Sequence, residues 1–159
     1  FGKEGEDFYY DENGLPAYNQ EILDQFTGVF SGEPIVDPWV RANCLPVPED
    51  FQAYSSREAL LNAFWNFYAR HREDCTILAD TPFPVEAGLL RACIDLDPQN
   101  RMQLSPYPVI DAASVFFAKG LDSDTDRMEF SGYIGRKHDP LADAIASAIC
   151  VIRLLKEPT

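Results

Sequence analysis

The hydrophobic residues between Ser55 and Arg70 recur every three or four positions, which is the spacing of an amphipathic helix. A capping box opens the stretch, because Glu58 follows Ser55 by three residues. We therefore expect a helix here whose buried side is aromatic and aliphatic. The residues expected on that side are Leu60, Leu61, Phe64, Trp65 and Tyr68.

Two short apolar runs alternate with further helices. Thr76–Ala79 and Val109–Ile110 are bounded by charged and turn-forming residues, so both are expected to be buried strands. A helix is expected to start at Pro84, after the first strand. Another is expected over Asp111–Lys119, where Gly120 stops it.

The last helix is expected to follow a polar loop over Ser123–Lys137. Asp139 is the expected N-cap, and Pro140 occupies the first helical position, where its missing N–H costs nothing. The apolar stripe of this helix is expected to face the core. Its members are Leu141, Ile145, Ile149, Ile152 and Leu155.

The first third of the chain gives weaker signals. Asp7–Tyr10 resembles a strand that ends in a turn at Asp11–Gly14. Ile22–Phe30 and Ile35–Leu45 fit either a strand or a helix. From Ser55 onward, helices and strands alternate, which predicts a single α/β domain over residues 1–159 with helices flanking a central mixed sheet.

The composition fits a globular protein and limits its function. Hydrophobic residues make up 46% of the 159, and 13 basic against 26 acidic residues leave a net charge of −13. This charge disfavours a long duplex-binding surface, but not a small pocket in which metal ions supply positive charge. The four scattered cysteines are expected to be reduced core residues and do not suggest a zinc site. Because no signal peptide or membrane-length apolar run is visible, we expect a cytoplasmic protein without membrane contact.

The segment that enters the last helix carries the clearest chemistry. His138 precedes the helix, and Asp143 follows it by five residues. A histidine at a loop edge can take a proton from an attacking water, and an aspartate in the first helical turns can hold a divalent cation. This pattern resembles the third exonuclease motif of the DEDDh 3′-5′ exonuclease superfamily. The other interpretation is a solvated loop histidine beside an acid that complements the helix dipole.

The stretch Ile77–Leu90 is similar to the second motif of that family, in which a strand ends in a loop and an acid opens the next helix. Glu86 lies where the family usually has aspartate, and Asp80, at the strand end, competes for the role. Asp111 also resembles a family feature, a strand leading to an aspartate, although we expect it to be an N-cap rather than a ligand. Trp39–Arg41 and the residues after it look like the branch of small 3′-5′ exoribonuclease-like proteins.

The first motif of the family is not intact in this chain. The family has an aspartate and a glutamate two residues apart on its first strand, and both bind metal. Aligned without a gap, Tyr9 and Asp11 fall at these two positions, so that one ligand is lost. Alternatively, Phe1–Tyr10 belongs to a later hairpin, and the first strand lies upstream of Phe1. The sequence permits both interpretations.

The resemblance implies a ribonuclease H-like fold and metal-dependent 3′-5′ exonuclease action on the ends of single-stranded RNA or DNA. His138 would be the general base, while Glu86, Asp143 and Asp11 would hold a pair of Mg²⁺ or Mn²⁺ ions. A homodimer is compatible with this interpretation. The other hypotheses are an inactive exonuclease fold that serves as a binding or scaffold module, and an unrelated α/β domain with an accidental match. The residues expected to contact the nucleic acid are Phe83, Tyr107, Arg136 and Lys137.

Overall fold

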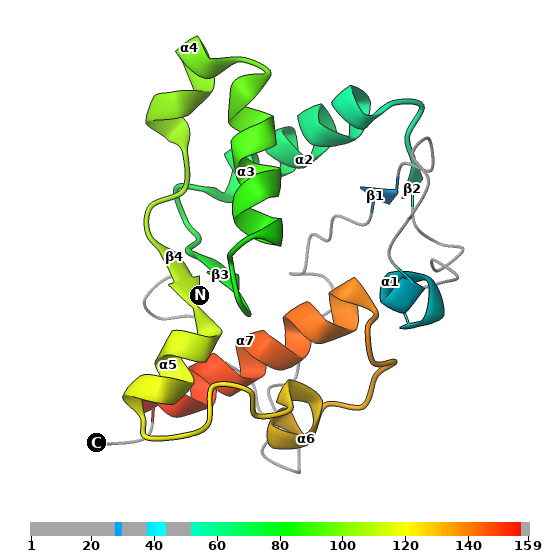
Figure 1. Ribbon diagram of the computed structural model, residues 1–159. Coiled ribbons are helices and arrows are strands. Elements are labelled where there is room, and N and C mark those ends of the chain that lie inside the picture. Colours follow the sequence, from blue (N-terminus) through cyan, green and yellow to red (C-terminus); the bar gives the residue numbers. More distant parts are fainter. Residues whose placement is uncertain (1–27, 30–37, 44–51, 157–159) are drawn as a thin grey trace.

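The computed structural model describes residues 28–29, 38–43 and 52–156, and helices make up most of this part (Figure 1). In chain order its elements are β1 (Gly28–Val29), α1 (Pro38–Asn43), β2 (Gln52–Ala53), α2 (Arg57–His71), β3 (Ile77–Ala79), α3 (Val85–Asp95), α4 (Pro98–Arg101), the 3₁₀ helix η1 (Met102–Leu104), β4 (Val109–Asp111), α5 (Ala112–Ala118), α6 (Arg127–Ser131) and α7 (Pro140–Lys156). The predicted strand Asp7–Tyr10 lies outside the described residues, and for residues 38–43 the undecided prediction resolves as helix α1.

The strands of the described part form two parallel pairs, β1 with β2 and β3 with β4. In the second pair Ala79 lies opposite Asp111, so the carboxyl ends of both strands lie side by side. The described residues therefore form two separate parallel pairs of strands, whereas a central mixed sheet was expected. The connection through α3, α4 and η1 returns the chain to the same edge, as a parallel pair requires. The fold class is thus α/β, as predicted.

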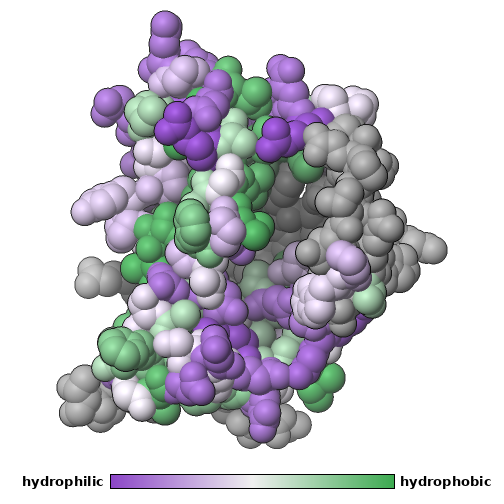
Figure 2. Space-filling view, in the orientation of Figure 1, coloured by the Kyte–Doolittle hydropathy of each residue, from purple (hydrophilic) through white to green (hydrophobic). Residues whose placement is uncertain are grey.

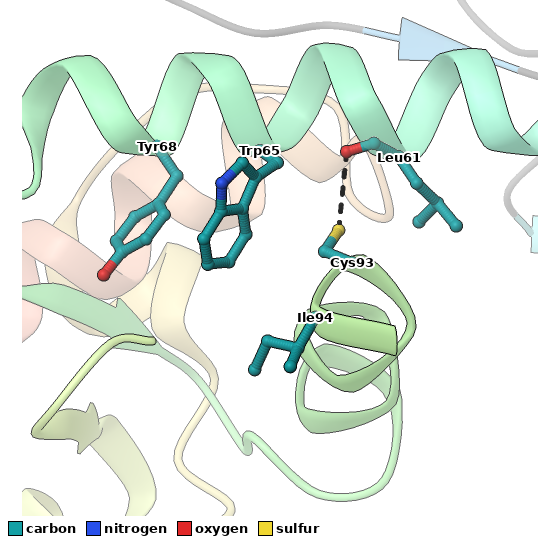
Figure 3. Close-up of a cluster of buried hydrophobic side chains, with 5 residues drawn as sticks. All are labelled: Leu61, Trp65, Tyr68, Cys93 and Ile94. Carbon is teal, nitrogen blue, oxygen red and sulfur yellow. Dashed lines mark hydrogen bonds between the residues drawn. The ribbon is translucent and has the colours of Figure 1, made fainter. Parts of the chain in front are cut away.

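Helix α2 packs against α3 through one apolar cluster (Figure 3). Leu61, Trp65 and Tyr68 are buried on α2, as the spacing predicted. The helix begins one residue later than the expected capping box, because the hydroxyl of Ser56, not Ser55, accepts a hydrogen bond from the Ala59 backbone N–H (3.0 Å). Glu58 therefore does not occupy the capping-box position.

Two of the cysteines belong to the core, as expected. Cys93 is buried between α2 and α3 and donates to the Leu61 carbonyl (3.5 Å), and Cys150 is buried on α7. Burial raises the pKa of the Cys150 thiol to about 11, so it stays protonated at neutral pH. Cys75 is exposed, so the prediction of a core position is wrong for this residue. Cys44 lies outside the described residues.

Helix α7 begins as predicted. The Asp139 carboxylate accepts from the backbone N–H groups of Leu141 (3.1 Å) and Ala142 (3.0 Å), and Pro140 is the first helical residue. Of the predicted apolar stripe, Ile149 is buried, Leu141, Ile145 and Ile152 are half-buried, and Leu155 is 54% exposed. Helices α5 and α6 approach α7 over a face with several small side chains. The buried residues of that face are Ala142, Ala146, Ser147, Ile149, Cys150, Val151 and Leu154.

Helix α6 lies within the stretch that we expected to be a loop. Asp126 caps it by accepting from the Glu129 N–H (3.0 Å), and Gly132 ends it in the left-handed conformation, with a φ of 70°. Met128 and Phe130 pack inward, against α7 and α5. This tertiary packing stabilises five residues that are too few to form a helix alone.

Candidate functional site

A cleft of about 270 Å³ lies beyond the carboxyl end of β3, the usual place of ligand sites in open α/β sheets. Three segments line it: the residue after β3, the stretch that leads into α6, and the entrance of α7. In Figure 2, hydrophilic side chains gather over residues 121–126 and α6 in the lower part of the molecule. The acids of the lining are Asp80, Asp124, Asp126 and Asp143, and its basic residues are Arg127, Lys137 and His138.

Asp80 directly follows β3, and its backbone carbonyl accepts from the Ala113 N–H (3.1 Å) at the start of α5. This bond holds the strand end against the neighbouring helix. The Asp80 carboxylate accepts from Nε of Arg127 through Oδ1 (2.7 Å), which forms an ion pair. Asp80 therefore reaches the cleft from a rigid strand end.

Asp143 stands in the first turn of α7, where its N–H donates to the Asp139 carbonyl (2.9 Å). Burial raises the pKa of the Asp143 carboxyl above its usual value. A hydrogen bond from the backbone of His138 and the charge of its imidazole act in the opposite direction, and the negative charges of Asp139 and Asp80 raise the pKa further. Asp80 and Asp143 therefore influence each other electrostatically within one cleft.

His138 is exposed at the cleft edge, on a loop as predicted, and not in a strand. Its backbone φ of 63° is in the left-handed region, which residues other than glycine rarely adopt. Its ring meets the Trp39 ring of α1 edge-on, with 4.9 Å between the ring centres. The imidazole is thus held at the rim, where it can meet a ligand from solvent.

Lys137 lines the cleft beside His138, and its ammonium group donates to the Asp126 carboxylate. This hydrogen bond lowers the pKa of Asp126, with help from the Glu129 N–H, and raises the pKa of Lys137. Lys137, which we predicted to contact nucleic acid, thus has its positive charge already balanced by Asp126. Arg136 is exposed on the same segment and is not part of the lining.

The remaining predicted site residues lie elsewhere. Glu86 is in the first turn of α3 and is not part of the cleft lining, whereas its competitor Asp80 is. A cation shared by Glu86 and Asp143 stays a prediction. Phe83, just before α3, is 79% exposed. Tyr107 is 96% exposed and lies before β4, at the amino ends of the strands and thus at the edge opposite the cleft. Asp11 lies outside the described residues.

Asp111 ends β4 next to Asp80 and precedes α5, in the N-cap position that we predicted. Its carboxylate makes no capping bond to the helix backbone and accepts from the Ser114 hydroxyl instead. The other carboxylate oxygen, Oδ1, is buried and has no hydrogen-bond partner among the described residues. The strand ends therefore carry two neighbouring carboxylates, of which Asp80 lines the cleft.

The cleft offers oxygen ligands of the kind that Mg²⁺ and Mn²⁺ prefer. Within residues 28–29, 38–43 and 52–156, no three histidine, cysteine or acidic side chains come together closely enough to hold a metal ion. Asp80 and Asp143 nevertheless suit a cation that takes its other ligands from water or substrate. A pair of ions needs further carboxylates.

Sequence reasoning missed Arg127 entirely. Its basic side chain stood in a stretch interpreted as a polar loop, and a pairing with Asp80 across 47 positions leaves no local pattern. One signal was present: Asp126 followed three residues later by Glu129 has the spacing of a helix N-terminus. That signal places Arg127 at the start of a helix, although not in the cleft.

Fold and cleft together define a mixed α/β protein with a small parallel sheet and a cleft of charged residues beyond the carboxyl end of β3. Comparisons of the chain with known protein families, with curated proteins and with solved structures give no match. Of the helices in the described part, none combines the length and the apolar character needed to cross a membrane. The function is therefore argued from the cleft.

Proposed function

We propose that this protein is a divalent-metal-dependent 3′-5′ exonuclease that acts on single-stranded RNA or DNA ends and has a ribonuclease H-like fold. The observation that carries the proposal is the meeting of Asp80, Asp143 and His138 in one cleft beyond the carboxyl end of a parallel strand. Carboxylates and a histidine in a cleft are the groups that phosphodiester hydrolysis needs.

Asp80 and Asp143 are the proposed cation ligands, and Glu86 and Asp11 remain candidates for completing the set. The raised pKa of Asp143 supports a functional role, because perturbed carboxyl groups in clefts are typical of functional sites. A bound Mg²⁺ or Mn²⁺ ion would supply Lewis-acid stabilisation of the charge on the reacting phosphate oxygens. Positive charge beside Asp143 also favours its ionised form.

His138 is the proposed general base, which takes a proton from the attacking water at an imidazole nitrogen. Its exposure at the rim allows the proton to pass on to solvent. The edge contact with Trp39 limits the orientations of the ring. A base must be positioned within hydrogen-bond reach of the proton that it removes, and a ring held at the rim suits this requirement.

Lys137 is the proposed phosphate contact. Its present partner is the Asp126 carboxylate, an anion in the same cleft. An incoming phosphate would replace that carboxylate with another anionic oxygen, so Lys137 would exchange one partner for another. Phe83 is the proposed stacking residue for a terminal base, because its ring is exposed.

A second function is favoured by one observation. Arg127 already neutralises Asp80 through a direct ion pair, as a bound cation otherwise would. The chain could on this basis be a binding module that retains an exonuclease fold without catalysis. Its signature is binding of single strands that does not require divalent ions.

The deciding experiment is a cleavage assay on single-stranded RNA and DNA labelled at the 5′ end, with Mn²⁺, Mg²⁺ or EDTA. The exonuclease proposal expects a ladder that shortens one nucleotide at a time, that disappears with EDTA and that is absent for Asp143→Asn. A substrate blocked at its 3′ end is the matched control and should stay intact. Metal-independent binding without cleavage would favour the binding module, and cleavage unchanged in Asp143→Asn would reject this assignment of the site.

A further inference from the structure

We propose that Arg127 is the positioning residue of the cleft, which holds Asp80 in the orientation needed to bind a divalent cation. The inference rests on the proposed function, because it assigns Arg127 a role through a proposed cation ligand. Arg127 touches neither the reacting atoms nor the cation in this proposal. It acts on Asp80 alone.

The Arg127 side chain is 9% exposed, although it carries a full charge. Burying a guanidinium is costly unless its donors are satisfied. Here all three nitrogens donate: Nε to Asp80 Oδ1 (2.7 Å), Nη1 to the Thr125 carbonyl (2.5 Å) and Nη2 to the Ser123 carbonyl (2.8 Å). These hydrogen bonds therefore fix the orientation of the Arg127 guanidinium within its plane.

A fourth contact fixes the guanidinium from its face. Its central carbon lies 4.2 Å from the centre of the Phe116 ring, and Phe116 is fully buried in α5. The backbone of Arg127 is tied as well, because its carbonyl accepts from the Cys150 thiol of α7 (3.4 Å). Arg127 thus connects α5, α7 and the segment before α6 to the end of β3.

This anchoring determines how Asp80 faces the cleft. Oδ1 is occupied by Arg127, and no described residue donates a hydrogen bond to Oδ2. A carboxylate held through one oxygen presents the other to a ligand in a defined direction. The same guanidinium holds the carbonyls of residues 123 and 125, and so fixes the cleft wall that carries Asp124 and Asp126.

Lysine cannot replace arginine in this role. Its ammonium can keep the charge and one bond to Asp80, but it has no planar fork to reach two carbonyls and no flat face for the ring. Arg127→Lys therefore separates orientation from charge. A matched control is Arg153→Lys, since Arg153 of α7 also donates to a backbone carbonyl, that of Phe130 (3.0 Å), and does not line the cleft.

The experiment measures Mn²⁺ binding to the full chain without substrate, by electron paramagnetic resonance of free Mn²⁺, and then the half-saturating Mn²⁺ concentration for cleavage. Partners that orient metal ligands are typically worth about 10–100-fold in metal affinity. Arg127→Lys is expected to weaken binding and to raise the half-saturating concentration by this factor. Arg153→Lys is expected to change neither quantity, at a comparable melting temperature.

A double-mutant cycle tests the route of the effect. Asp80→Asn should weaken Mn²⁺ binding by itself, and adding Arg127→Lys should then have no further effect. If Arg127→Lys does not fold, Phe116→Leu loosens the same guanidinium while keeping an apolar side chain. Loss of a cation–π contact then predicts binding about 2–30-fold weaker.

Different outcomes overturn the two proposals. A parent chain that neither binds Mn²⁺ nor cleaves single strands overturns the proposed function and this inference with it. A parent chain that binds Mn²⁺, while Arg127→Lys or Phe116→Leu binds it equally well, overturns the inference alone. Equal weakening by Arg127→Lys with and without Asp80→Asn also overturns it, because Arg127 would then act independently of Asp80.

Discussion

The two sides of the β3–β4 pair are stabilised in different ways. On one side, α2 and α3 enclose large apolar side chains around Trp65 and Ile94 (Figure 3). On the other side, α5, α6 and α7 also bury large apolar side chains, among them Phe116 and Leu154, and a buried arginine joins these helices to the strand end. Both sides gain stability by burying hydrocarbon. The second side differs because it also buries the charge of Arg127, which rarely adds stability by itself and points to function.

The difference shows where in the molecule a function is to be sought. Polar groups on the cleft side are compensated one by one: Asp80 by Arg127, Lys137 by Asp126, and the free N–H groups of α7 by Asp139. At Asp143 burial raises the pKa of the carboxyl, although a hydrogen bond from the His138 backbone acts in the opposite direction. We therefore expect substitutions on the two sides to separate activity from stability.

The largest effect is expected for Asp143→Asn on the cleft side. Metal-ion stabilisation of the reacting oxygens is worth several kcal/mol, so losing a cation ligand should lower turnover on the order of 10⁴-fold. Turnover with saturating Mn²⁺ and 5′-labelled strands is the measurement. If Asp143→Asn keeps most of the parent's activity, the cleft is not the catalytic site.

His138→Ala should follow, with turnover lowered about 10²–10⁴-fold, the usual contribution of a general base. Because His138 is exposed, the melting temperature of the variant should stay close to that of the parent. Single-turnover kinetics and a thermal melt on the same preparation separate the two effects. Unfolding of the variant would instead make His138 a packing residue and its catalytic role wrong.

Trp65→Ala tests the apolar side. Trp65 is buried in the α2–α3 cluster, and truncating a buried aromatic side chain typically costs about 3–5 kcal/mol. We expect a lower free energy of unfolding in urea, while Mn²⁺ affinity at a temperature where the variant is folded stays as in the parent. A changed Mn²⁺ affinity would show that the two sides are coupled.

The smallest effect concerns pH. The pKa of Asp143 is raised by folding, so the folded state binds this proton more tightly than the unfolded chain does. The contribution of Asp143 to stability is therefore lost as the pH rises from the usual aspartate value, about 3.9, through the folded value. Asp143→Asn should flatten this part of the urea-unfolding profile and be the more stable form at neutral pH. A steeper profile in the variant would contradict the sign.

The sequence predicted features that depend on neighbouring residues. Asp139 and Pro140 define the start of α7 by local chemistry, and the α2 core residues follow from their spacing. The sequence failed where the outcome depends on distant partners. Packing against α5 and α6 determines which face of α7 is buried, and the short helix α6 is marked in the sequence only by the spacing of Asp126 and Glu129. Whether Asp80 or Glu86 meets the cleft depends on how β3 ends against α5, which no local spacing contains.

The left-handed backbone at His138 has a consequence for how its role can be isolated. Glycine adopts this conformation without steric cost, whereas alanine or a branched residue does not. His138→Gly should therefore remove the imidazole, relax the backbone and leave a space beside the Trp39 ring. We expect free imidazole added to the solution to restore part of the turnover that His138→Gly loses, because it supplies the same basic nitrogen. The positive φ at His138 thus makes glycine the substitution that best separates the loss of the imidazole from a change in the backbone.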